Sequence, residues 1–232
     1  KRYWRRFAST SRIWSSMTSE LPLIIPDWPA PSWVKSASTT RVGGVSRPPW
    51  DTLNLGTHVG DSPEDVKRNR RVLHQRLGLV DERFGWLNQV HGTDVVELPE
   101  AGVVRADASV TSQPGNICVI LTADCLPVLF CDDQARRVAV AHAGWRGTLK
   151  KIGLKVILKM QKKFSTQKQD LIIGIGPSIS REKYQVGSEV IEKFQESFSF
   201  WEEFIFIKEK KYFLDLSLCN KMLFNNIGIP SS

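Results

Sequence analysis

The stretch VAVAHAGWRGTLKKIGLKVILKM, residues 138–160, decides the fold class. Residues 138–141 are valine and alanine, and His142 follows them. This run of small or branched apolar residues predicts a short buried strand that ends at His142. After the turn at Gly144 the spacing of the apolar residues changes. Leucine, isoleucine, valine and methionine recur at intervals of three and four over residues 149–160, with lysines between them, and this spacing predicts an amphipathic helix. A strand that leads directly into a helix indicates a mixed architecture.

The rest of the chain mixes strands and helices without strict alternation and without an internal repeat, so we predict a single α+β domain. A helix should begin at Pro63, because Ser62 can cap it and two acidic residues follow in the first turn, and it should end at Gly78. Two further helices are expected at residues 190–198 and 217–225. Strands are expected at residues 86–91, 117–121, 128–130, 171–175, 204–207 and 212–216.

Composition and charge place the chain among globular proteins. Of its 232 residues, 41% are hydrophobic and 24% are charged, which suits a chain that buries a core. The net charge of +8 is uneven, since residues 1–16 contain five basic residues and no acid, which leaves +3 for the remainder. A nucleic-acid partner is therefore not expected. No apolar run approaches the roughly 18 residues of a membrane helix, so we predict no membrane partner either.

Residues 1–19 are predicted to be a basic leader, and the folded domain is placed at residues 20–232. The leader is rich in Arg and Ser, like an organelle transit peptide, but Met17 stands directly before the globular pattern. We therefore expect the natural start to be Met17 and the residues before it to be disordered or non-native. Organelle targeting is the less favoured interpretation. Four cysteines without a CxxC pair indicate free thiols in a reducing compartment, and we predict a cytoplasmic protein.

Three residues that can bind a metal stand at expected strand ends. His91 and His142 each end a strand before a glycine or Ala-Gly, and Cys125 ends a third strand in the same manner. Their spacings of 34 and 17 residues are unlike the short ligand pairs of structural zinc sites and suit a catalytic zinc with three protein ligands. Taken singly, Cys125 also fits a small core residue, and each histidine fits a buried, hydrogen-bonded side chain.

Other polar residues lie near these three in the sequence. Asp124 precedes Cys125 in an otherwise apolar strand, where a carboxylate is costly unless it is paired or bound to something. Arg146, in a glycine-flanked loop, suits a phosphate or another anion, or else a surface ion pair. His58 stands in a glycine-flanked loop from which it can reach a ligand, and we take it as a catalytic candidate. The remaining histidine, His74, falls inside the first expected helix and is interpreted as a surface residue.

Seven short motifs between about residues 21 and 229 are similar, in order, to the hallmark segments of one family. The chain resembles the laccase-domain family, long labelled polyphenol oxidase and now regarded as purine nucleoside phosphorylases. The motifs are TTRVGGVS (39–46), DTLNLG (51–56), QVHG (89–92), TADCLPV (122–128), HAGWRG (142–147), GPSI (176–179) and YQVG (184–187).

The resemblance implies a layered α/β/β/α sandwich with mixed sheets. It also implies a zinc ion (Zn2+) held by His91, Cys125 and His142. In one pocket the enzyme would cleave adenosine, inosine and methylthioadenosine with phosphate and would also deaminate adenosine, so purine nucleosides and phosphate are the expected partners. Family members continue past residue 229 into an arginine-bearing motif and a final strand, so we expect the domain to lack its C-terminal strand.

The resemblance further assigns pocket residues. Arg41, Asn54 and Arg146 would bind substrate. Asp124 would also line the pocket. Our own hypothesis for the reaction is that Asp124 orients the base or exchanges a proton with it, and that Arg146 positions phosphate.

Other functions stay open at this point. The laccase label is set aside, because four histidines cannot supply the ligands of several copper ions. A metal-free hydrolase or deamidase would use Cys125 as nucleophile and His142 as base. A binding module would hold zinc without catalysis. The sequence does not fix the oligomeric state, and a homodimer is one expectation.

Overall fold

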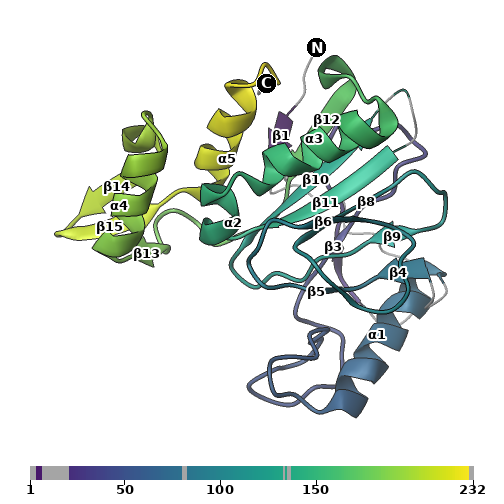
Figure 1. Ribbon diagram of the computed structural model, residues 1–232. Helices are drawn as coiled ribbons and strands as arrows, with labels where there is room; N and C mark the ends of the chain where they lie inside the picture. Colours follow the sequence, from purple (N-terminus) through teal and green to yellow (C-terminus); the bar gives the residue numbers. More distant parts are fainter. Residues whose placement is uncertain (1–3, 7–20, 80–82, 133, 135–136, 230–232) are drawn as a thin grey trace.

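A six-stranded mixed sheet forms the centre of the molecule (Figure 1). The computed structural model describes residues 4–6, 21–79, 83–132, 134 and 137–229. The order across the sheet is β1 (Trp4–Arg6), β12 (Leu171–Ile175), β10 (Leu126–Asp132), β11 (Arg137–Ala143), β8 (Ala108–Thr111) and β6 (Val95–Glu97). The two outer pairs, β1–β12 and β6–β8, are parallel, and the inner pairs are antiparallel.

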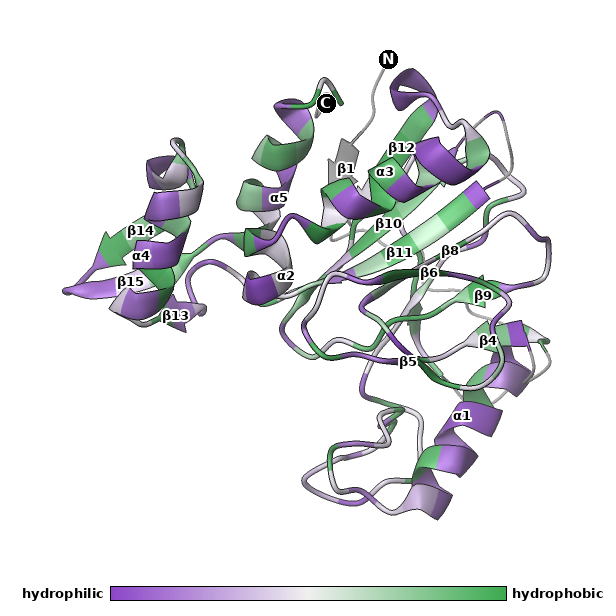
Figure 2. Ribbon diagram, in the orientation of Figure 1, coloured by the Kyte–Doolittle hydropathy of each residue, from purple (hydrophilic) through white to green (hydrophobic). Residues whose placement is uncertain are grey.

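Three helices cover one face of this sheet: α2 (Trp145–Leu149), α3 (Ile152–Phe164) and α5 (Leu216–Asn225) (Figure 1). The apolar face of α3 lies on the sheet, where Val156 and Met160 are fully buried in the same cluster as Phe130 of β10. Gly153 allows α5 to approach closely, since a Cβ atom there would lie 2.5 Å from the Phe224 ring. Figure 2 shows the result as hydrophobic strands β10 and β11 beneath a helix with one polar face.

Short strands and a helix form the layers on the opposite face. The pairs are β4 (Phe84–Gly85) with β9 (Ile117–Cys118) and β5 (Leu87–Asn88) with β7 (Val104–Arg105). Helix α1 (Pro63–Leu77) lies beyond them, and its Leu73 joins Phe84 in a second apolar cluster. A two-stranded sheet of β2 (Leu23–Ile24) and β3 (Ser38–Thr39) completes this side. Together with the helices above the central sheet, these layers confirm the predicted α/β/β/α arrangement.

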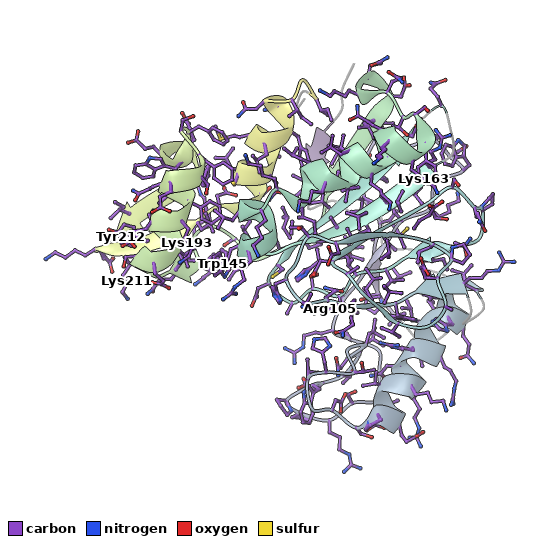
Figure 3. All side chains as sticks on the ribbon, viewed as in Figure 1. Arg105, Trp145, Lys163, Lys193, Lys211 and Tyr212 are labelled. Carbon is purple, nitrogen blue, oxygen red and sulfur yellow. The ribbon has the colours of Figure 1, made fainter. Side chains whose placement is uncertain are left out.

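A small unit stands beside α2 and α5 (Figure 1). It consists of β13 (Gln185–Val186), α4 (Ser188–Ser197), the 3-10 turn η3 (Trp201–Glu203), β14 (Ile205–Lys208) and β15 (Lys211–Leu214). The other 3-10 turn, η2 (Lys168–Asp170), directly precedes β12 of the central sheet. Phenylalanine rings fill its interior, with Phe194, Phe198 and Phe204 each 3% exposed or less. Figure 3 places Trp145, at the start of α2, on the side of the central body that faces this unit.

The structure tests the expected elements. Ser62 caps α1 and Gly78 ends it in the left-handed conformation, as predicted. The helix predicted over residues 149–160 is instead two helices, because Lys151 adopts a φ of 60° between α2 and α3. The strand expected at residues 117–121 is wrong beyond Cys118, where β9 ends.

The described residues bear on the expected absence of a membrane helix and on the expected leader. No helix among the described segments is both long and apolar enough to span a bilayer. Within the leader predicted at residues 1–19, residues 4–6 form β1 beside β12, and the remainder lies outside the described residues.

Candidate metal centre

The pairing of β10 with β11 brings two of the three predicted ligands to one edge of the central sheet. Cys125 directly precedes β10, and His142 is the second-last residue of β11, where it pairs with Pro127. Because the strands are antiparallel, the start of one lies beside the end of the other. The prediction that Cys125 ends a strand is therefore wrong, since it stands in the bend that leads into β10. His91 lies in a loop after β5.

The side chains of His91, Cys125 and His142 converge. One potential ligand atom from each lies within 4.8 Å of those of the other two, and the two imidazole rings have centroids 4.7 Å apart. Gly144 borders the cluster, because a Cβ atom there would lie 2.8 Å from the Cys125 sulfur and 3.3 Å from His91. Two imidazoles and one thiol form a donor set that suits a metal ion with nitrogen and sulfur preference, and His91 is exposed enough to leave access.

His142 is buried and has two polar neighbours. Its Nδ1 lies 2.8 Å from a carboxylate oxygen of Asp107. Burial alone would lower the pKa of His142, but the interactions with Asp107 and with Cys125 outweigh it and raise the pKa to about 9. By contrast, burial and the charge of His142 lower the pKa of His91.

Two residues that support the cluster, Asp107 and Gln89, were not predicted from the sequence. Asp107 accepts hydrogen bonds from the backbone N–H groups of residues 90–92 as well as facing His142. Gln89 bonds to the backbone of Leu121 in both directions, at 2.8 Å and 2.6 Å, and so ties the loop of His91 to the segment that leads to Cys125. A single carboxylate in the otherwise small and apolar run around Asp107 was the available signal.

Asp124, Arg146 and Tyr184 lie close to the three ligands. The pKa of the Tyr184 hydroxyl is raised to about 12, and burial is the largest cause. The charges of Cys125, Asp124 and Arg146 also act on this hydroxyl. The Arg146 guanidinium lies over the Trp145 ring, 4.2 Å from its centroid, and remains exposed. Asp124 is exposed too, in the bend before β10, so the expected burial of its carboxylate in a strand is wrong.

The other predicted site residues lie on the loops next to α1. His58 is exposed, and its charge acts on His91. The Asn54 amide bonds within its own loop, to Gly56 and to Asp61. Arg41 forms an ion pair with Asp51 at 2.6 Å and is largely exposed. Within the part of the chain that the structure describes, no hydrogen bond or ion pair joins Arg41 or Asn54 to the metal ligands, so their assignment to substrate binding stays a prediction.

His74 lies away from this centre and is not a surface residue. It is 5% exposed, and its ring stacks on Phe84 with centroids 3.9 Å apart. Burial, followed by the charge of Arg70, lowers the pKa of His74. The arginines beside it in the sequence suggested exposure, but Arg70 itself lies over the Trp86 ring, 3.8 Å from its centroid.

A family model described as multi-copper polyphenol oxidoreductase laccase matches residues 35–232. The chain belongs to this family. Curated relatives of this chain are named purine nucleoside phosphorylases. One from Pseudomonas aeruginosa is 47% identical over 171 residues, which cover 74% of this chain and 68% of the relative. One from Haemophilus influenzae is 40% identical over 212 residues, covering 89% of this chain and 84% of the relative.

Solved structures agree with the fold. A Neisseria meningitidis protein is 38% identical, with a TM-score of 0.82 over 90% of this chain and 85% of that one. YlmD from Geobacillus stearothermophilus is 27% identical, with a TM-score of 0.85 over 94% of this chain and 86% of that one. The mixed α/β domain predicted from the sequence is therefore confirmed, and so is the family.

Proposed function

We propose that this chain is a zinc-dependent purine nucleoside phosphorylase that also deaminates adenosine, with adenosine, inosine and methylthioadenosine as substrates. The observation that carries the proposal is the convergence of His91, Cys125 and His142 within 4.8 Å of one another, beside an exposed arginine. Relatives that are 47% and 40% identical carry the name purine nucleoside phosphorylase. The free thiols fit the predicted cytoplasmic location.

Zinc is the metal that best matches the donor set. Three protein ligands with mixed nitrogen and sulfur donors are typical of catalytic zinc, and His91, Cys125 and His142 would hold the ion. When bound, zinc supplies a Lewis acid beside the substrate. Oxidation by several coppers is disfavoured, because the whole chain contains four histidines and His74 stacks on Phe84 in a separate apolar cluster.

Phosphorolysis transfers the ribose of a nucleoside from the base to phosphate. An oxygen of phosphate bonds to C1′ as the glycosidic bond breaks, and the purine leaves with one proton. Arg146 suits the binding of the anionic phosphate, because its guanidinium is exposed and the Trp145 ring limits its motion. Asp124 is the residue that we assign to proton exchange with the base, and His58, whose charge acts on His91, is a further catalytic candidate.

Two assays test this function. Purified protein loaded with zinc is incubated with inosine and phosphate, and the products are separated by chromatography; hypoxanthine and ribose 1-phosphate are expected. Adenosine without phosphate should yield inosine. If neither hypoxanthine nor inosine forms in the zinc-loaded protein, the proposed function is wrong.

A pair of matched variants tests the role of Arg146. Arg146→Gln should raise the KM for phosphate about 10- to 100-fold, since a charge-assisted hydrogen bond contributes about 1.5–3 kcal/mol. Arg181→Gln is the control, because Arg181 is also exposed and lies over an aromatic ring, Phe206, at 4.7 Å. The same rise in both variants would contradict the assignment.

A metal-free hydrolase or deamidase remains the second candidate, because Cys125 and His142 interact directly. Elemental analysis and alkylation separate it from the first. One zinc per chain that protects Cys125 from iodoacetamide supports the metal enzyme, whereas a reactive Cys125 in a protein without zinc supports the hydrolase. Nucleoside binding without turnover, measured by calorimetry, would favour a binding module.

A further inference from the structure

Asp107 is a fully buried carboxylate that forms hydrogen bonds with two of the three candidate ligands and with the loop of His91. It precedes β8 and has no exposed surface. One oxygen lies 2.8 Å from His142 Nδ1 and accepts the His91 N–H at 2.9 Å. The other oxygen accepts the N–H groups of Val90 at 3.1 Å and Gly92 at 2.7 Å. Four donors therefore face one carboxylate.

The bond to His142 determines which ring nitrogen faces the cluster. A carboxylate only accepts hydrogen bonds, so the proton lies on Nδ1 of His142. Nε2 is then the nitrogen left for a metal ion. An outer carboxylate that fixes the orientation and the tautomer of a histidine ligand typically raises metal affinity by one to two orders of magnitude.

The bonds to the loop determine the backbone conformation of the other histidine. His91 has a φ of 56°, a left-handed conformation that residues other than glycine rarely adopt. Three successive N–H groups turn inward onto the Asp107 carboxylate, which forms a small anion-binding nest. The carboxylate thus stabilises the one loop conformation that presents His91 beside His142.

All four contacts to Asp107 come from donors, and each carboxylate oxygen faces two of them. A neutral amide could not replace the carboxylate. Whichever way an asparagine side chain turned, its NH2 group would face two of the four donors.

We propose that Asp107 is the positioning residue of the metal centre, which sets the tautomer of His142 and the loop conformation of His91 before the ion binds. The inference rests on the metal centre of the proposed function and not on the reaction. Its effect should therefore appear in metal affinity, whether or not nucleosides are cleaved.

A matched pair of variants separates positioning from plain stability. Asp132 is also buried, at 1% exposure, and it pairs with Arg137 at the far end of β10. Asp107→Asn should weaken zinc binding about 10- to 100-fold in competition with a chromophoric chelator and should change the visible spectrum of the cobalt(II)-substituted protein. Asp132→Asn should lower the midpoint of thermal unfolding but leave zinc affinity and the cobalt spectrum unchanged.

Clear outcomes would overturn the inference. One is zinc affinity in Asp107→Asn within about twofold of the wild type, and another is an equal loss in both variants. If Asp107→Asn does not fold, nitrogen NMR of the zinc-loaded wild-type protein decides the matter: a protonated Nδ1 on His142 supports the inference, and zinc on Nδ1 overturns it. A wild-type protein that binds no zinc would also overturn it. Absence of phosphorolysis alone would refute only the proposed reaction.

Discussion

Gly144 leaves room for the three ligands because it has no side chain. Its backbone, with a φ of −66° and a ψ of 173°, is open to any residue, so conformation alone does not require glycine. Space does, since a Cβ atom would lie 2.8 Å from the Cys125 sulfur. Either the thiol or the turn before α2 would have to move, and both belong to the cluster.

Gly144→Ala should therefore weaken zinc binding by about tenfold or more, while the circular dichroism spectrum stays that of the wild type. The measurement is competition with a chelator. Gly102→Ala is the control, because Gly102 has a φ of 75° and nothing within 4 Å of its added Cβ. That variant should cost about 1–2 kcal/mol of stability without a change in affinity. Unchanged zinc affinity in Gly144→Ala would contradict this account.

At the scale of residues, chemistry was easier to predict from the sequence than burial. The convergence of His91, Cys125 and His142 was predicted from the scarcity of histidine, from their places beside turns and from the family resemblance. The structure confirms that they converge, and metal binding by them stays a prediction. Asp107 was missed, because its four bonds reach residues 15 to 35 positions away, and the lone carboxylate in an apolar run does not indicate which residues it contacts. His74 was misplaced for the same reason, since its burial depends on Phe84 across the α1–β4 contact.

At the scale of elements, α1 was predicted nearly to the residue because its signals are local. Ser62 bonds to the backbone of Asp65, and Gly78 adopts the left-handed conformation that ends the helix. The two-residue strands lack such signals at their ends: β5 and β9 were predicted too long, and β4 and β7 were not predicted. Their partners lie 17 residues away for β5 and β7 and 33 residues away for β4 and β9, and a strand of two residues shows no period.

The contact between α1 and β4 should make stability depend on pH. The pKa of His74 is lowered in the folded protein, so the unfolded chain takes up a proton below about pH 6.5 that the folded chain resists. The free energy of unfolding should therefore fall as pH decreases from about 6.5, by up to about 1.4 kcal/mol per pH unit. His74→Phe keeps the stacking on Phe84 and should remove this part of the slope.

Urea unfolding of the metal-free protein between about pH 5 and pH 8 measures the effect. At about pH 8 the difference between His74→Phe and the wild type gives the packing contribution alone, because the histidine is then neutral in both states. His142 acts in the opposite window, since its raised pKa of about 9 makes a stabilisation that is complete below about pH 6.5 and is lost as pH rises toward 9. Parallel pH profiles for the two proteins would contradict the role of His74.

At the scale of the whole molecule, the candidate metal centre joins parts of the chain that the fold brings together separately. Cys125 and His142 are placed by the central sheet, and His91 by a loop of the short-strand layer. The ligands are absent as a cluster from the unfolded chain, because 51 residues separate the first from the last. Metal binding should therefore add its free energy to folding.

Zinc should raise the midpoint of thermal unfolding, and a chelator should reverse the rise. At a free concentration of about 100 times Kd the gain is about 2.7 kcal/mol, which corresponds to roughly 5–10 °C for a domain of this size. Cys125→Ser should abolish the shift, because it removes the only sulfur among the three ligands. Cys118→Ser should retain it, since Cys118 lies in β9 outside the cluster. Equal shifts in wild type and Cys125→Ser would mean that the stabilising zinc binds at another site, because zinc stabilises the folded protein only by binding to it.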